Sequence, residues 1–158
     1  MNPEKKVELV MNLMYNLLLA VILSAIAEII NAGGIQWPGL LIDIVISFIL
    51  EMIISMGLPL AKWGAALGMK HAKPGSPKFK VIMTGCIAIP FAFLMSAAMS
   101  FIGIKMAGAP TFAWGPAFLK VWPVFTVLAW ILSYFLIPPF MGLARKICGV
   151  PEQQHHQG

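Results

Sequence analysis

The sequence predicts an all-α integral membrane protein, and three observations support this fold class. Hydrophobic residues make up 59% of the 158 residues and charged residues only 11%, whereas soluble domains carry about 25% charged residues. Four stretches reach the length of about 20 mostly apolar residues that a membrane-spanning helix needs. The polar stretches between them are too short to fold alone, so we expect residues 1–158 to form a single four-helix membrane domain.

The first two expected spans cover residues 9–30 and 40–61. Gly33 and Gly34 follow the first span, and paired glycines are typical of the end of a helix. Pro38 precedes the second span, and proline is favoured in the first turn of a helix because its missing N–H would have no partner there. A short connection therefore joins these two spans into a helical hairpin.

The third and fourth expected spans cover residues 81–104 and 117–137. A turn with the sequence Lys-Pro-Gly-Ser-Pro at residues 73–77 precedes the third span. Two prolines at residues 138–139 follow the fourth span, and we expect them to end or kink its helix. These long unbroken apolar runs argue against a β-barrel, whose strands would be short and would alternate apolar with polar residues.

The lysine and arginine residues predict how the chain is oriented in the membrane. Cytoplasmic segments of membrane proteins carry an excess of these residues. Nine of the eleven lie in the two termini and the central connection, whereas Lys105 and Lys120 lie in or beside the connection of the second hairpin. We therefore expect both termini in the cytoplasm. The same distribution explains the net charge of +5, so we expect the lipid bilayer as a partner and no nucleic acid.

The two halves of the chain resemble each other in sequence. At a shift of 72 residues the first half matches the second at Ala20, Ser24 and Ala25 (Ala92, Ser96 and Ala97), and at a shift of 78 at Pro38, Ser55 and Gly64 (Pro116, Ser133 and Gly142). We therefore predict two helical-hairpin repeats, at about residues 9–70 and 80–149. Because each contains two spans, the copies would enter the membrane in the same sense, related by a pseudo-twofold axis along its normal.

The second half has a Met-, Ser- and Ala-rich span at residues 93–100 and a span that runs through residues 138–139 to a basic end at Arg145 and Lys146. This pattern resembles a family of small bacterial inner-membrane proteins of unknown function that is built on a two-helix unit. The resemblance covers both halves and implies the bacterial inner membrane as the location. It supplies no active-site residues, and the first half departs from it by carrying acids inside its helices.

Three acids, Glu28, Asp43 and Glu51, lie inside the expected spans, where charged residues are rare and usually functional. Glu51 lies midway along the second span, and the other two lie near the outer ends of their spans. Ser47 and Ser55 continue the spacing of four residues between Asp43 and Glu51, so these side chains share one helix face. The first span has a matching face, made of Asn12, Asn16, Ala20, Ser24 and Glu28. We expect the two faces to meet.

The environment of Glu51 allows two interpretations. No lysine or arginine lies at its depth, so we expect it to be protonated or to hold a cation. In the first interpretation the protein is a small transporter or channel that moves a cationic solute, and Glu51 exchanges that solute for a proton. In the alternative the protein is a scaffold or accessory subunit, and Glu51 is a neutral acid bonded to Ser47, Ser55 or Thr126. A cavity that reaches Glu51 favours the first, and a carboxyl sealed by hydroxyls favours the second.

The acids near the outer ends of the spans also allow two interpretations. Asp43 and Glu28 form ion pairs with Lys105 or Lys120, or they line the entrance for a solute.

The methionines offer a further alternative. Met52 and Met56 in the second span, and Met95 and Met99 in the third, are each one helical turn apart. Thioethers suit Cu(I), so these rows are candidate ligands for Cu(I) permeation, with Cys148, His155 and His156 as acceptors on the cytoplasmic side. Methionine is also an ordinary packing residue in apolar cores, and we expect no permanent metal site.

No pattern typical of an enzyme is present. The chain lacks Gly-x-Ser-x-Gly and Cys-x-x-Cys motifs, and no histidine lies within a span, so we expect no enzymatic activity and no cofactor. Gly64 and Gly68 form a small-residue motif that brings helices close, either within the chain or between copies. Because four helices enclose little space, we expect a homo-oligomer.

Overall fold

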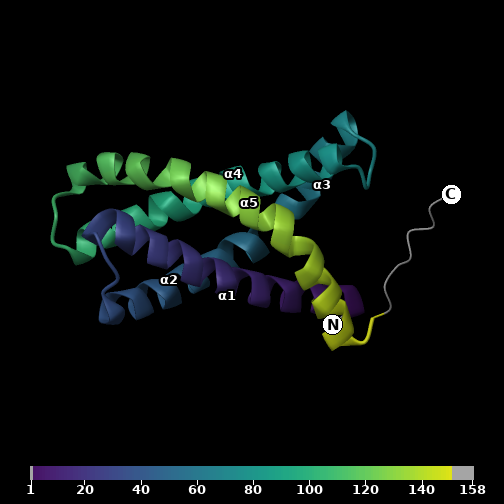
Figure 1. The fold of residues 1–158 in the computed structure, drawn as a ribbon, viewed down its shortest axis with the longest axis horizontal. Coiled ribbons are helices and arrows are strands. Elements are labelled where there is room, and N and C mark those ends of the chain that lie inside the picture. The colour runs from purple at the N-terminus through teal and green to yellow at the C-terminus, as the bar shows by residue number, and fades with distance from the viewer. Residues whose placement is uncertain (1, 151–158) are drawn as a thin grey trace.

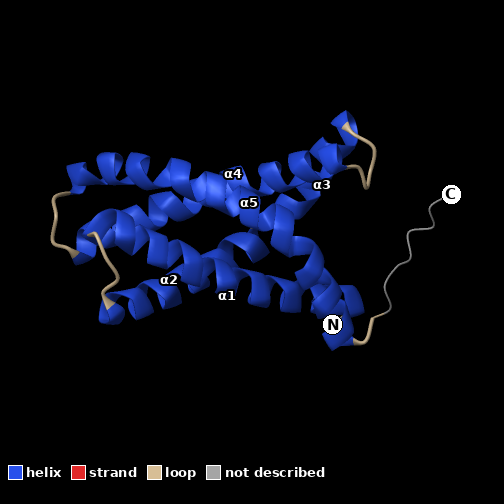
Figure 2. Ribbon diagram, viewed as in Figure 1, coloured by secondary structure: helices blue, strands red, loops and turns tan. Residues whose placement is uncertain are grey.

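The computed structural model describes residues 2–150, and the side chains of all of these except residues 31 and 32. This range is almost entirely helical and contains no strand (Figures 1 and 2). The helices in chain order are α1 (Pro3–Ala32), α2 (Trp37–Gly57), α3 (Leu60–His71), α4 (Pro77–Met106), the short 3-10 helix η1 (Thr111–Ala113) and α5 (Trp114–Cys148). By length and composition α1, α2, α4 and α5 can each cross a membrane, which confirms the predicted all-α membrane fold.

Local sequence sets the ends of the long helices. The Asn2 side chain accepts a hydrogen bond from the Glu4 N–H at 3.2 Å, and Ser76 Oγ accepts one from the Phe79 N–H at 3.1 Å. These bonds satisfy N–H groups that have no partner in the first turns of α1 and α4. Gly33 ends α1 in the left-handed conformation, with φ of 74°, which glycine adopts without steric cost.

The predicted end of the second span is wrong. We expected one helix through residue 61, but α2 ends at Gly57 and a separate helix, α3, begins at Leu60. Pro59 is the cause, because proline has no N–H to donate and disfavours the helical conformation in the residue before it. Leu58 is accordingly extended, with φ of −113° and ψ of 132°.

The double proline of the last helix has a different effect. Helix α5 continues through Pro138 and Pro139 to Cys148, and it bends in its second half (Figure 1). We predicted that these prolines end or kink the helix, and a kink is what is observed.

The last segment of each half of the chain packs against the first helix of the other half. Helix α3 packs along the beginning of α4, and the last turns of α5 lie beside the beginning of α1 (Figure 1). Arg145 Nη2 and Glu4 Oε2 form an ion pair at 3.5 Å there, and Ala144 is fully buried. The predicted sequence repeat itself remains a prediction.

The two glycines of α3 pack within the chain. A Cβ atom on Gly64 would lie 2.7 Å from the Met83 carbonyl oxygen, and one on Gly68 would lie 2.8 Å from the Phe79 ring. Neither position has room for a side chain, so these glycines allow α3 and α4 to approach closely. Of the two readings of this motif, contact inside the chain is the one observed.

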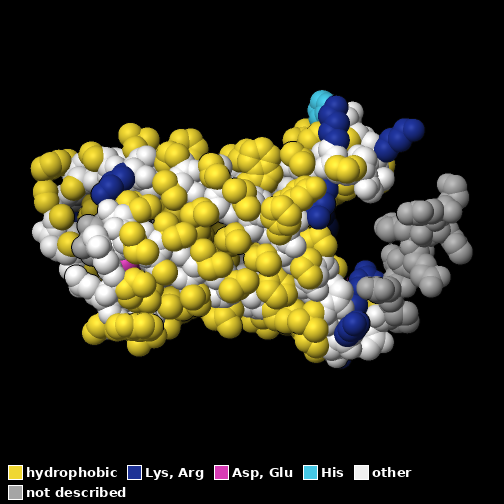
Figure 3. Space-filling view, viewed as in Figure 1, with side chains coloured by type: hydrophobic (Ala, Val, Ile, Leu, Met, Phe, Trp, Pro, Cys, Tyr) yellow, Lys and Arg dark blue, Asp and Glu magenta, His cyan; other side chains and the backbone are white. Residues whose placement is uncertain are grey.

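Charged and apolar side chains are separated along the molecule (Figure 3). Apolar side chains cover its length, and blue basic side chains gather at the end where the chain begins and where the α3–α4 turn and the end of α5 lie. We call this the basic end, and the opposite end, with the α1–α2 and α4–α5 connections, the loop end. Placing the basic end in the cytoplasm remains a prediction.

Candidate functional site

The predicted meeting of two polar faces is observed between α1 and α2. The hydroxyls of Ser24 and Ser47 share a hydrogen bond of 3.0 Å. One turn beyond Glu51, Asn16 Nδ2 donates to Ser55 Oγ at 2.9 Å and to Met52 Sδ at 3.3 Å. We call this line of contacts the polar seam.

Glu51 lies in the middle of the polar seam, and its side chain is 0% exposed. Neither of its carboxyl oxygens has a hydrogen-bond partner among the described residues. The expected bonds to Ser47, Ser55 or Thr126 are therefore absent.

The three hydroxyls of these expected bonds donate their hydrogens elsewhere. Ser47 Oγ donates to Met99 Sδ at 3.5 Å, and Ser55 Oγ donates to the backbone oxygen of Met52 at 3.3 Å. Thr126 Oγ1 donates to the Trp122 carbonyl in its own helix at 2.9 Å. None of these three donors is directed to the buried carboxyl.

Tyr15 belongs to this region, although the sequence analysis did not single it out. Its hydroxyl lies 2.6 Å from Ser133 Oγ, and Ser133 donates its own hydrogen to the Ala129 carbonyl at 2.6 Å, so Tyr15 is the donor of the first bond. Tyr15 directly precedes Asn16, a member of the polar seam, on α1. A tyrosine within an apolar span was the available signal, since a buried hydroxyl needs a partner.

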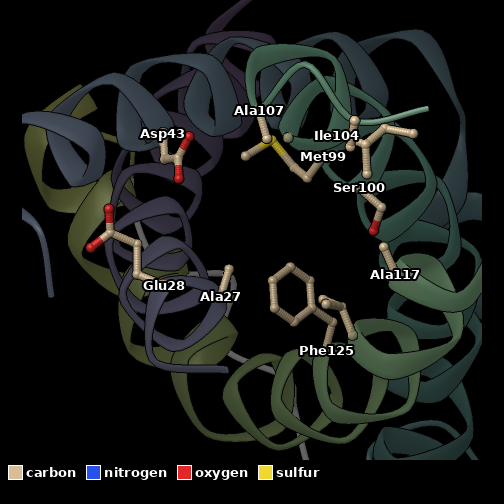
Figure 4. A pocket seen from close by; sticks show the side chains of 12 residues that line it. Ala27, Glu28, Asp43, Met99, Ser100, Ile104, Ala107, Ala117 and Phe125 are labelled. Carbon is tan, nitrogen blue, oxygen red and sulfur yellow. The ribbon is translucent and has the colours of Figure 1, made fainter. Parts of the chain in front are cut away.

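A cavity of about 390 Å³ opens near the loop end (Figure 4). Its lining includes both acids from the outer ends of the first two spans, Glu28 and Asp43, with Met99, Ser100 and Phe125 on the other sides. The entrance interpretation of the two acids therefore has a cavity to support it.

The two acids differ in their partners. Glu28 Oε2 accepts a hydrogen bond from the Gln36 N–H at 2.7 Å, so it fastens the connection that leads into α2. Asp43 makes no hydrogen bond or ion pair with the described residues. The expected ion pairs are absent there, because Lys105 donates to Thr111 Oγ1 at 3.0 Å and Lys120 to the Ile30 carbonyl at 2.8 Å.

A second cavity, of about 310 Å³, opens near the basic end. Tyr15, Asn16, Ser55 and Ser133 supply polar groups to its wall, and most of the remaining lining is apolar. The chain therefore has an open cavity toward each end of the bundle. We expected a homo-oligomer because four helices enclose little space. These cavities weaken that reason, and the homo-oligomer remains a prediction.

A layer of buried side chains separates the two cavities, and we call it the central layer. Its members are at most 1% exposed and line neither cavity: Leu19, Ala20, Leu23, Glu51, Ala92, Met95, Ser96 and Ala129. Glu51 is its one ionisable member. Neither of the two arrangements considered for Glu51 is present, because no cavity reaches the carboxyl and no hydroxyl seals it.

The methionine rows do not form a continuous path. Met56 is 64% exposed on the outer surface, whereas Met95 is fully buried in the central layer. Met52 accepts a hydrogen bond from Asn16, and Met99 lines the loop-end cavity. Among the described residues no group of three or more His, Cys, Asp or Glu side chains can hold a metal ion. His155 and His156 lie outside the described residues.

Comparisons of the chain with protein-family models, with curated proteins and with solved structures find no match. The resemblance to the family of small bacterial inner-membrane proteins therefore remains a prediction. Functional inference has to rest on the geometry of the polar seam and the two cavities.

Proposed function

We propose that this chain is a small transporter that moves a cationic solute across the membrane, with Glu51 as the coupling group. The observation that carries the proposal is the isolation of Glu51, a fully buried carboxyl without a hydrogen-bond partner between two cavities on opposite sides of the membrane core. A buried polar group without a partner destabilises a fold. Such a group in the spans of a membrane protein is a functional candidate by default.

The chemistry follows from charge. An unpaired carboxylate in an apolar bundle is costly, and a bound proton or a bound cation removes the cost by making the site neutral. Ser47, Ser55 and Thr126 donate to other atoms, so these three hydroxyls do not compensate the charge. Glu51 can therefore exchange one positive species for another, as coupled transport requires.

The two cavities supply routes toward Glu51. On α2, Asp43 lines the loop-end cavity about 12 Å from Glu51 along the helix axis, and Ser55 lines the basic-end cavity about 6 Å away in the other direction. The carboxyl of Asp43 attracts cations to its cavity, while the basic-end cavity is lined by neutral polar groups and by the opposite charges of Glu8 and Lys62. Passage requires the central layer to open on each side in turn.

The scaffold alternative lacks the contact that it expects, just as the transport interpretation lacks a cavity that reaches Glu51. The scaffold alternative expects a carboxyl held by serine hydroxyls, and Ser47 and Ser55 donate to other atoms. We further propose that the membrane is the bacterial inner membrane and that both termini are cytoplasmic, on the basis of the nine basic residues at one end.

The test uses the purified full chain in proteoliposomes that contain a pH-sensitive dye. Sodium, potassium, choline and tetraphenylphosphonium chlorides are added outside in turn, and the proton flux that each one drives is recorded. We expect Glu51→Gln to abolish the flux. Glu4→Gln makes the same chemical change at the basic end, on an exposed side chain that pairs with Arg145, and should retain the flux. Equal flux in wild type and Glu51→Gln would overturn the proposal, and absence of flux with all four cations would favour the scaffold.

A further inference from the structure

Besides the Glu51 oxygens, two buried side-chain atoms lack a hydrogen-bond partner among the described residues, Trp122 Nε1 and Ser96 Oγ. Ser96 Oγ on α4 is fully buried and makes no hydrogen bond with the described residues. Other hydroxyls on the long helices bond either to a second side chain, as Ser24 and Ser47 do, or to a carbonyl of their own helix. In the second way Thr84 bonds to Lys80 at 2.8 Å and Ser133 to Ala129 at 2.6 Å.

Ser96 lies at the same depth as Glu51. Helices α2 and α4 run in opposite directions, and the contact between Ser47 and Met99 fixes their register. About one turn from this contact toward the basic end, α2 reaches Glu51 and α4 reaches Ser96. The unpartnered oxygens of the two side chains therefore belong to one level of the bundle.

Each of the other two helices places an alanine at this level, beside larger apolar side chains such as Leu19 and Leu23. The bonds from Ser24 to Ser47 and from Asn16 to Ser55 bracket Glu51 on α2 and Ala20 on α1. Ala129 is the member of the central layer on α5. Neither alanine competes with Glu51 for space, and neither carries a polar side-chain atom.

We propose that the Glu51 carboxylate and the Ser96 hydroxyl together bind one bare monovalent inorganic cation, with Na⁺ as the ion to test. The inference rests on the proposed transport function and names its solute. Three observations support it: the charge of the two side chains, the kind of ligand atom that they supply, and the burial of the site.

One carboxylate and one neutral hydroxyl balance a single positive charge, so a divalent ion would leave a net charge in the apolar bundle. Both ligands are oxygens, which suit hard cations and not Cu(I). Neither cavity reaches this level, which excludes a bulky organic cation from the site as it stands. A proton and the metal ion compete for the same carboxylate.

The first experiment measures thermal unfolding of the purified full chain in lipid nanodiscs. Sodium chloride is compared with choline chloride at equal ionic strength, because a ligand that binds only the folded state raises Tm. We expect Na⁺ to raise the Tm of the wild type by several degrees. Tetraphenylphosphonium and calcium chlorides should have no such effect, and a larger shift with either of them would overturn the inference.

Matched variants assign the effect to the two residues. Glu51→Gln should abolish the Na⁺ shift, and Ser96→Ala should weaken the apparent affinity about tenfold, with partial recovery in Ser96→Thr. Thr84→Val removes a buried hydroxyl of the same helix that bonds to its own backbone, and it should keep the full shift. Helical circular dichroism shows whether each variant is folded. A wild type without a Na⁺ shift, or an undiminished shift in Ser96→Ala, would overturn the inference.

Uptake of radioactive Na⁺ into proteoliposomes separates this inference from the proposed function. A Na⁺ shift that depends on Glu51 and Ser96, without uptake, would support the site and count against transport. Glu51-dependent flux of another cation, without any Na⁺ shift, would support transport and overturn the sodium site.

Discussion

The hydroxyls of Ser24 and Ser47 share a hydrogen bond of 3.0 Å inside the membrane core, where both side chains are at most 2% exposed. This contact joins α1 to α2 one turn from Glu51, and Ser47 extends it to α4 by donating to Met99. Three helices thus take their register from one pair of serines. The two serines hold the helices together and make no hydrogen bond with Glu51.

The first prediction concerns the strength of this serine pair. Hydrogen bonds between membrane helices contribute about 0.6 kcal/mol on average. A double-mutant cycle of Ser24→Ala and Ser47→Ala should therefore give a coupling of about that size in the free energy of unfolding. A coupling near zero would show that the contact does not fix the register of α1 and α2.

The second prediction concerns the hydroxyl of Tyr15. Tyr15→Phe removes its hydrogen bond to Ser133 and should lower the free energy of unfolding by about 1 kcal/mol. Tyr134→Phe is the matched control, because the Tyr134 ring lies under the Lys80 ammonium at 4.3 Å and keeps that contact in the variant. Reversible unfolding in mixed micelles measures both, and equal effects would contradict the assignment.

The third prediction concerns the contact of α3 with α4. A methyl group at Gly64 would meet the Met83 carbonyl, which belongs to the backbone and cannot rotate away. Gly64→Ala should therefore cost about 1–3 kcal/mol of unfolding free energy, as overpacking does elsewhere. Gly115→Ala places the same group in open space at the start of α5 and should be neutral or slightly stabilising. A neutral Gly64→Ala would mean that α3 is not held at this distance.

The fourth prediction separates stability from function at Glu51. Glu51→Leu removes a buried carboxyl without a partner, so it should raise the free energy of unfolding by about 1–3 kcal/mol while it abolishes cation flux. Glu28→Ala is the opposite case, because it leaves the Gln36 N–H without its acceptor and should destabilise the chain by about 1 kcal/mol. If Glu51→Leu destabilised the fold, the carboxyl would have a partner in the membrane.

The fifth prediction concerns Asp43 as an attractor of cations. Asp43→Asn should raise KM for the transported cation severalfold and leave the maximal rate unchanged, since a charge in an entrance raises the local concentration of cations. Added salt should reduce the difference between the variant and the wild type. Glu28→Gln, which keeps an oxygen acceptor for Gln36, should have little effect on KM. A fall in maximal rate for Asp43→Asn would place this residue at the rate-limiting step.

Most of the fold could be predicted from the sequence because the length and apolarity of a span are local properties. All four expected spans fall on observed helices. The second span ended too late in the prediction, since residues 58–61 remain apolar while Pro59 interrupts the backbone. Hydropathy measures side chains, and the break between α2 and α3 is a property of the backbone.

The candidate site could be predicted only in part. The spacing of four residues predicted that two polar faces meet, and the bonds from Ser24 and Asn16 confirm it. The isolation of Glu51 could not be predicted. Ser47 donates to Met99 on α4, and the sequence does not show that these two residues are neighbours. Glu28 is a similar case, since its bond to Gln36 depends on the path of the α1–α2 connection.

The exchange of end segments between the hairpins has a consequence for how the protein is assembled. Helix α3 is synthesised before α4, and α1 is synthesised long before the end of α5. Helices α1 and α3 therefore leave the ribosome before the segments that they finally pack against. The first hairpin remains incomplete until the second has been inserted. The two halves are therefore interlocked at the basic end, and a chain cut at the α3–α4 turn would yield fragments that each lack one wall of their own packing.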